Sequence, residues 1–479
     1  MADCWKLCSS PDPPAQYMTL SYRWGVQPGT MLLRRNFDDF HRDTPISILP
    51  QTFQDAITVA RAFSVAYIWI DALCIIQDSD TDWELEAPTM RYVYSHSACN
   101  IAASAAADQH SGLFRTRHGE SVLPGFFKSG TTSTNHGTDR FLIFDKGYWS
   151  RYLNCGALHS RGWVFQECLL APRVVYFAED QILWECLIGN KCEGFPEGIP
   201  YHQRTKDLSP LWDSLENDVD RQIYGTSKQM SYKIHTLWSN LVERYSSCDL
   251  TFSKDKLPAL SGVAQVFASA TGDKYAYGMW HSRIVEQLLW RVATPNPGRS
   301  LPQSKVPSWS WASLDGTIEM TPIPISWKSL VEIVEIKHTN MFAESSSQSS
   351  NPSLRLKGAL SVLGESGTKD HSSIRLGSLR LGCDISPDYH HVHDDRSSHA
   401  VYFLPTLSAH PWYPAKRFTT QVVGLVLASQ GQNTPVKFHR VGLFSTDRSH
   451  DIERLGLTIT PEGLATLKRL EHQQEIEII

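Results

Sequence analysis

Polar side chains that could bind a charged ligand follow two apolar segments near the start of the chain. Tyr17-Met-Thr-Leu-Ser-Tyr-Arg-Trp-Gly25 is an apolar, β-branched run that stops at a glycine, as a buried strand does where it turns. Ala66-Tyr-Ile-Trp-Ile-Asp71 is apolar up to its aspartate, which is typical of a strand inside a parallel sheet. Ligands of such sheets bind beyond the carboxyl ends of the strands. The candidate binding residues at this edge are Ser21, Arg23, Trp24, Gly25 and Asp71.

These residue types can contact a ligand through charge, stacking and close approach to the backbone. The guanidinium of Arg23 can bind phosphate oxygens, Trp24 can stack on a ring, and Gly25 lets a ligand come close to the backbone. Each residue also has a structural alternative. Arg23 and Trp24 are equally compatible with packing or ion pairing, and an aspartate such as Asp71 more often caps the following turn.

Helix and strand patterns alternate around these residues. Apolar side chains recur at helical spacing from residue 53 to 63, and Thr52 followed by Asp55 is typical of a capping box. A second helical face, from residue 83 to 94, is interrupted by Pro88. The remaining elements are expected to be strands at 99–103, 141–144 and 173–177, a long loop at 105–140, and a helix at 161–170. This alternation predicts an α/β domain with a parallel sheet.

The pattern changes after residue 190. Amphipathic stripes at 234–245, 259–270 and 283–292 predict a helical middle region. The segment Ser308-Trp-Ser-Trp-Ala-Ser313 and several later runs alternate with period two, which predicts a β-rich final domain. We therefore expect a tail at 1–14, an α/β domain at 15–190, a helical region at 191–315 and a β-rich domain at 316–479.

Composition excludes several classes of protein. The 479 residues carry a net charge of −5 without a dominant basic stretch, which argues against a nucleic-acid binder. The apolar runs are too short to span a bilayer, and Met1 to Pro14 lacks the apolar run of a signal peptide. The ten cysteines form no CxxC pair and are expected to be reduced thiols. A cytoplasmic protein without a membrane partner is predicted.

Three segments, in this order, resemble the signature blocks of the fungal heterokaryon-incompatibility (HET) domain. They are Leu20-Ser-Tyr-Arg-Trp-Gly25, Ile68-Trp-Ile-Asp-Ala-Leu-Cys-Ile-Ile-Gln77 and Arg161-Gly-Trp-Val-Phe-Gln-Glu167. Flanking segments extend the resemblance over about residues 15 to 190. The departures are modest: Arg23 stands where cysteine is frequent, Ile76 where an acidic or amide residue is usual, and Cys168 where arginine is frequent. The resemblance implies a role in fungal non-self recognition that ends in growth arrest or cell death, with a protein partner and self-association.

The family is also remotely similar to Toll/interleukin-1 receptor (TIR) domains, which have a flavodoxin-like parallel sheet. A strand ending Leu-Ser-Tyr-Arg resembles the first TIR strand, and Trp163 with Glu167 four residues later resembles the Trp-Cys-x-x-Glu segment of plant-type TIR domains. In TIR domains that cleave NAD, this glutamate is the catalytic residue. The resemblance therefore implies that Glu167 is catalytic and that Trp163 contacts the substrate.

The chemistry of NAD cleavage is compatible with one carboxylate. The bond between ribose and the cationic pyridinium breaks through an oxocarbenium-like transition state, and nicotinamide leaves as a neutral molecule, so no general acid is needed. A carboxylate that faces the developing positive charge can stabilise it. For Glu167 the structural alternative is an ordinary helical glutamate, and for Trp163 it is core packing. The competing function is a non-catalytic interaction module that recognises a partner protein.

Other motifs carry less chemistry. The segment His390-His-Val-His-Asp-Asp395 has the composition of a metal site, but a polar loop explains it, and we expect neither a metal nor a cofactor, with NAD as a substrate only. Cys168 is expected to be buried and inert. Glu185 is a second carboxylate whose orientation the sequence leaves open. The motifs of P-loop proteins, serine hydrolases and zinc proteases are missing from the sequence.

Overall fold

The computed structural model shows that the chain folds into two compact units. The first unit contains residues 1–209 and 248–263, and the second contains residues 210–247 and 264–479. The structure describes the chain with the exception of residues 1–2, 10–13, 27–28, 129–139, 144, 146, 155, 201–205, 207, 209–210, 212–230, 294–305, 322–326, 339–350, 364–374, 377–378, 381–383, 388–400, 410–419, 431–435, 461–463 and 469–472.

A six-stranded sheet forms the centre of the first unit, with the strand order β10-β9-β8-β5-β2-β4. Its strands in chain order are β2 (Tyr17–Ser21), β4 (Tyr67–Trp69), β5 (Cys99–Ala102), β8 (Arg173–Phe177), β9 (Ile182–Cys186) and β10 (Asn190–Cys192). The first four are parallel, and β9 and β10 are antiparallel to their neighbours. Because β4 lies on one side of β2 and β5 on the other, the strand order reverses between β2 and β5.

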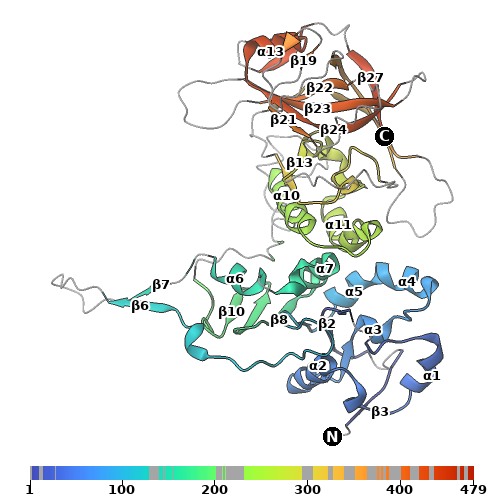
Figure 1. The fold of residues 1–479 in the computed structure, drawn as a ribbon, viewed down its shortest axis with the longest axis vertical. Coiled ribbons are helices and arrows are strands. Elements are labelled where there is room, and N and C mark those ends of the chain that lie inside the picture. The colour runs from blue at the N-terminus through green and yellow to red at the C-terminus, as the bar shows by residue number, and fades with distance from the viewer. Residues whose placement is uncertain are drawn as a thin grey trace. The chain divides into compact units, whose positions relative to one another are not determined.

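Helices cover both faces of this sheet. Figure 1 shows α2 on one side and α5, α6 and α7 on the other. The helices of the first unit are α1 (Phe37–Phe40), α2 (Gln51–Ala62), α3 (Asp71–Cys74), α4 (Asp80–Glu86), α5 (Met90–Ser95), α6 (Tyr148–Asn154) and α7 (Gly162–Leu170). Short 3-10 turns and the small strand pair β1 (Cys4–Trp5) and β3 (Thr44–Pro45) complete the unit.

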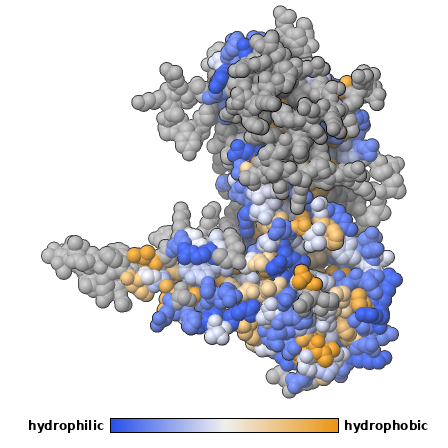
Figure 2. Space-filling view, in the orientation of Figure 1, coloured by the Kyte–Doolittle hydropathy of each residue, from blue (hydrophilic) through white to orange (hydrophobic). Residues whose placement is uncertain are grey.

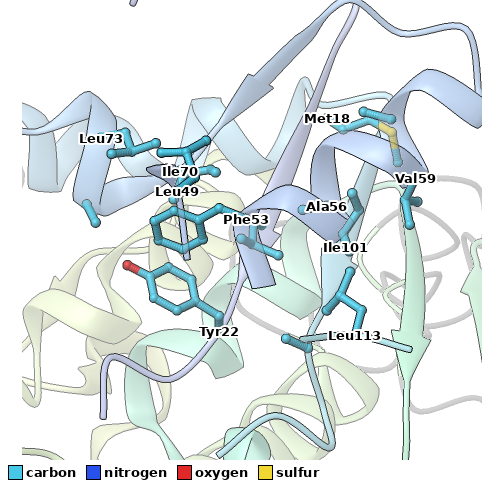
Figure 3. Packing of buried hydrophobic residues seen from close by; sticks show 14 of the residues in the cluster. Met18, Tyr22, Leu49, Phe53, Ala56, Val59, Ile70, Leu73, Ile101 and Leu113 are labelled. Atoms are coloured by element: carbon cyan, nitrogen blue, oxygen red, sulfur yellow. The ribbon is translucent and has the colours of Figure 1, made fainter. Parts of the chain in front are cut away.

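The two faces are built by alternation along the strands, since successive strand residues point to opposite sides. In β8, Val175 and Phe177 belong to the apolar cluster under α2, whereas Val174 and Tyr176 belong to the cluster under α6 and α7. Figure 3 shows the first cluster, in which the ring of Tyr22 meets Phe53 edge to face at 5.0 Å between ring centres. The central strands β2, β5 and β8 are therefore buried on both faces, as their apolar sequences predict, whereas the edge strand β4 is partly exposed.

A nine-stranded sheet dominates the second unit, and the path through seven of its strands is β15-β22-β23-β24-β27-β17-β16. Its strands are β15 (Trp327–Ser329), β16 (Glu332–Lys337), β17 (Ser353–Ala359), β18 (Ser361–Leu363), β21 (Asp384–Pro387), β22 (Val401–Ala409), β23 (Gln421–Gln430), β24 (Lys437–Thr446) and β27 (Gln473–Ile478). The helices that follow the first unit's sheet in sequence are α10 (Tyr232–Ser246), α11 (Pro258–Thr271), α12 (Ile284–Gln287) and α13 (Ser449–Arg454). The mixed α/β composition of the chain is therefore confirmed.

Three local predictions are wrong. The predicted loop at 105–140 contains the strand β6 (Gly125–Lys128), which pairs with β7 (Arg140–Ile143) in a two-stranded ribbon that extends away from the sheet (Figure 1). Ser308–Ser313 is not a strand: Ser310 caps a 3-10 turn at Trp311–Ser313 through its hydroxyl. The capping box is also absent, because Pro50 is the N-cap residue of α2.

The surface of the first unit mixes hydrophilic and hydrophobic residues on the face shown in Figure 2. Within the described residues, no helix is both long and apolar enough to cross a membrane.

Candidate functional site

Glu167 is a buried carboxylate on the helix that covers the centre of the sheet. It lies on α7 and is only 6% exposed. Its Oε2 accepts a hydrogen bond of 2.5 Å from the hydroxyl of Ser21, the last residue of β2. The predicted catalytic residue and one predicted binding residue, which are 146 positions apart in the sequence, are therefore in direct contact.

Polar side chains of β2 and β5 continue this contact across the sheet. The Asn100 amide donates to the Ser21 hydroxyl at 2.9 Å, and its Oδ1 accepts from Thr19 at 3.0 Å. All three residues are buried, and strand alternation places them on the face that α7 covers. A polar stripe thus crosses the otherwise apolar sheet at the point where the strand order reverses.

Asp71 forms the second acidic position. It is half-buried at the start of α3, immediately beyond the carboxyl end of β4. One carboxylate oxygen accepts from the Trp24 indole at 2.9 Å, and the other accepts from the backbone N–H of Ala72 at 2.7 Å. The structure therefore pairs Trp24 with Asp71, two residues that the sequence places at the same edge.

The surroundings of Glu167 favour its protonated form. Burial raises the pKa of Glu167 from 4.5 to about 7, and the negative charge of Asp71 adds to this rise. Hydrogen bonds from Ser21 and Tyr94 and the positive charge of Arg161 act in the opposite direction. Burial also raises the pKa of Tyr94 well above its usual value, so its hydroxyl stays protonated. The carboxyl group of Glu167 can therefore change its protonation state near neutral pH.

Arg161 connects the start of α7 with the end of β2. Its guanidinium donates to the backbone carbonyl of Tyr22 at 2.5 Å. The side chain of Tyr22 is buried, and burial together with the negative charge of Asp71 raises the pKa of this tyrosine. Arg161 therefore places a positive charge near Glu167.

The other three predicted binding residues lie in different surroundings. Arg23 is half-buried and makes no hydrogen bond or ion pair with another described residue. Gly25 has a φ of +78°, and a Cβ at this position would lie 2.5 Å from that of Asp108, so the turn itself requires glycine. Trp163 is half-buried and packs edge to face on Trp83, with 6.4 Å between ring centres.

Sequence reasoning missed Thr19, Asn100, Tyr94 and Arg161 as members of the site. A usable signal existed for two of them. Strands in the middle of a parallel sheet are apolar on both faces, so Thr19 and Asn100 interrupt that pattern and mark a polar position. Tyr94 and Arg161 reach the site only through tertiary packing, and their local sequence gives no indication of it.

A second buried carboxylate lies nearby on the same face of the sheet. Glu185 of β9 accepts a hydrogen bond of 2.5 Å from the Tyr176 hydroxyl. The ammonium of Lys206 donates to the backbone carbonyl of Cys168 at 2.6 Å. Burial lowers the pKa of Lys206, whereas the charge of Glu185 raises it. The hydrogen bond from Lys206 holds the end of α7, the helix that carries Glu167.

The described residues contain no group of three or more His, Cys, Asp or Glu side chains with the arrangement of a metal site. The segment His390–Asp395 lies outside the described residues.

Comparisons with known proteins identify the first part of the chain. The family model described as heterokaryon incompatibility protein (HET) matches residues 17–167, from the first residue of β2 to Glu167. Neither a curated protein nor a solved structure matched the chain. The resemblance to the HET domain is therefore confirmed over this segment, which contains Ser21, Asp71 and Glu167.

Proposed function

We propose that the chain acts in heterokaryon incompatibility as a fungal cell-death protein and that its first unit cleaves NAD in the cytoplasm. The HET domain at residues 17–167 supports the first part of this proposal. The second part depends on one observation, the contact between Ser21 and the buried carboxyl group of Glu167.

The position of this contact supports a ligand site. Ser21 ends β2, and the strand order reverses between β2 and β5 at the same edge. In open α/β sheets, ligands bind beyond the carboxyl ends of the strands at such a point. The order of the four parallel strands also agrees with a TIR-like or flavodoxin-like arrangement, which we include in the proposal.

The proposed reaction is hydrolysis of the bond between nicotinamide and ribose. The bonding electron pair leaves with the nicotinamide nitrogen, and the ribose carbon becomes an oxocarbenium-like centre. A water oxygen then bonds to this carbon, and its proton is released to solvent, so the products are nicotinamide and ADP-ribose. Ionised Glu167 would bind the ribose hydroxyls and stabilise the developing positive charge. Ser21 would hold that carboxylate in place.

The remaining predicted residues have supporting roles in this proposal. Arg23 would bind the pyrophosphate, and Trp24 and Trp163 would contact the rings of NAD. Gly25 and Asp71 would shape the edge of the site.

The proposal is tested in cells. Expression of the wild-type chain in a fungal host should lower NAD and arrest growth, and Glu167→Gln should abolish both effects. Glu84→Gln serves as the matched control, because Glu84 is an exposed helical glutamate. Full toxicity and NAD loss in a folded Glu167→Gln protein would refute the catalytic part.

The alternative is a non-catalytic signalling module that recognises a partner protein. One observation favours it: Glu167 is buried and already bonded to Ser21, as a structural carboxyl group would be. If Glu167→Gln retains growth arrest while exposed substitutions in residues 316–479 abolish it, the interaction function is correct.

A further inference from the structure

A segment far along the chain packs against the helix that carries Glu167. Residues 248–262, which we call the return segment, belong to the first unit although residues 210–247 belong to the second. The Asp249 carbonyl accepts a hydrogen bond of 2.9 Å from the backbone N–H of Gly162, the first residue of α7. Asp249 also donates its N–H to the carbonyl of Ser160. The return segment therefore fixes the start of α7.

The next contact is one residue further along α7. Asp255 is 9% exposed and lies in a 3-10 turn of the return segment. Burial raises its pKa, and a hydrogen bond from the side chain of Trp163 partly offsets this rise. Trp163 therefore lies between Asp255 and Trp83 of α4.

The third contact requires a glycine. The backbone N–H of Gly262 in α11 donates to Oε1 of Gln166 at 2.7 Å, and Gln166 is 1% exposed. A Cβ on Gly262 would lie 2.6 Å from this oxygen and 2.7 Å from the Cβ of Arg91 in α5. Both distances are shorter than a van der Waals contact, so any larger residue would push α11 away from α7 and α5.

Together these contacts hold α7 at residues 162, 163 and 166, just before Glu167. A helix of nine residues has little stability alone and takes its position from tertiary contacts. Gly262 lies in the first part of α11, so the return segment contacts α7 both through its loop and through the start of this helix.

We propose that the return segment is a positioning element that sets the place of Glu167, with Gly262 as its positioning residue. The effect on activity rests on the proposed NAD cleavage, but the effect on α7 does not. A change in the return segment would loosen or tighten α7 without touching the ligand.

The test compares Gly262→Ala with Gly189→Ala in the full-length protein. Gly189 is the matched control, because a Cβ there has no neighbour within 4 Å. Hydrogen exchange of the α7 amides should be at least about tenfold faster in Gly262→Ala, since overpacking separates the helices, and unchanged in Gly189→Ala. The amides of α2, on the other face of the sheet, should keep their wild-type rates in both variants.

A second variant keeps the test decisive if Gly262→Ala fails to fold. Asp255→Ala removes the partner of Trp163 without adding volume and should also accelerate exchange in α7. Wild-type exchange in α7 of folded Gly262→Ala, or equal acceleration in α2 and α7, would overturn the proposal.

Activity separates this proposal from the proposed function. If the wild type cleaves NAD, Gly262→Ala should lower the rate and move its pH midpoint below that of wild type, because a loosened α7 exposes Glu167 to water. An unchanged rate and pH midpoint would overturn the control of Glu167. If the wild type cleaves no NAD, faster exchange in α7 still supports the return segment as a positioning element.

Discussion

At the scale of single residues, Glu167 combines two demands that oppose each other. The carboxyl group that the proposed reaction requires in its ionised form lies in a place where burial favours its neutral form. Ser21, Tyr94 and Arg161 offset part of this cost. Such a compromise between stability and chemistry is common at functional sites.

This compromise predicts how stability depends on pH. The pKa of Glu167 is raised from 4.5 to about 7 in the folded chain. Between these two pH values the carboxyl group is protonated in the folded chain but ionised in the unfolded chain. The contribution of Glu167 to stability therefore falls as pH rises from about 4.5 to about 7. The Glu167→Gln variant, which carries no charge at any pH, should be more stable than wild type by about 2 to 3 kcal/mol at pH 8.

Calorimetry of the full-length protein at pH 5 and pH 8 measures this difference in the unfolding transition of the first unit. The difference in the free energy of unfolding between Glu167→Gln and wild type, called the gap below, should be small at pH 5 and larger at pH 8. A gap that is the same at both pH values would contradict the raised pKa of Glu167. The exposed Glu84→Gln provides the control and should show no gap.

The sequence predicts part of this site and misses part for a physical reason. Ser21 ends one apolar strand and Asp71 follows another, so their common edge could be deduced from the pattern. The role of Glu167 was implied only by family resemblance, and its contact with Ser21 was not predicted, because spacing within one helix does not say which strand the helix covers. Arg161 was missed since its role depends on the path of its long side chain to the Tyr22 carbonyl.

At the scale of elements, α2 shows that residues with the spacing of a capping box can have another structural role. Asp55 does not complete a capping box. It accepts from the backbone N–H of Leu113 at 2.7 Å and from Gln51 at 2.6 Å. Thr52 donates to the carbonyl of Asp108 at 3.1 Å. The two polar residues therefore attach the loop that follows β5 to α2.

Asp55→Ala should weaken this attachment. The buried N–H of Leu113 would lose its acceptor, which costs about 1 to 3 kcal/mol. Thermal unfolding of the first unit should shift to lower temperature, and exchange of the Leu113 amide should accelerate. The exposed Glu84→Ala on α4 is the control. Wild-type stability of Asp55→Ala would show that the hydrogen bond to Leu113 contributes little.

Element predictions succeeded where local rules dominate. The interruption at Pro88 is confirmed, because α4 ends at Glu86 and α5 begins at Met90. The strand β6 was missed, since it pairs only with β7 and its four residues lie in a segment rich in Ser, Thr, Gly and His. The period-two alternation at Ser308–Ser313 was misleading because Trp309 and Trp311 are both buried in a turn.

At the scale of the whole molecule, each of the two units contains a buried apolar cluster. Phe53 is completely buried in the cluster under α2, and Phe403 is completely buried in the cluster of the second unit. The first unit is also discontinuous in sequence, because the return segment belongs to it. Local patterns could not predict this, since nothing in residues 248–262 indicates which helix they contact.

Core variants in the two units should act separately. Phe53→Ala should destabilise the first unit by about 3 to 5 kcal/mol, and Phe403→Ala should do the same for the second. In calorimetry, each variant should lower the melting temperature of one transition and leave the other within about 1 kcal/mol of wild type. Equal shifts of both transitions by either variant would show that the chain unfolds as one cooperative unit.

The central claim is that Glu167 supports cleavage of NAD, and nicotinamide release by the purified full-length protein tests it most directly. Wild type, Glu167→Gln and the control Glu84→Gln should be compared at low and high protein concentration and after artificial clustering. The account predicts release by wild type and Glu84→Gln and a loss of at least about a hundredfold in Glu167→Gln. Equal release by folded Glu167→Gln, or no release by wild type under any of these conditions, would contradict it.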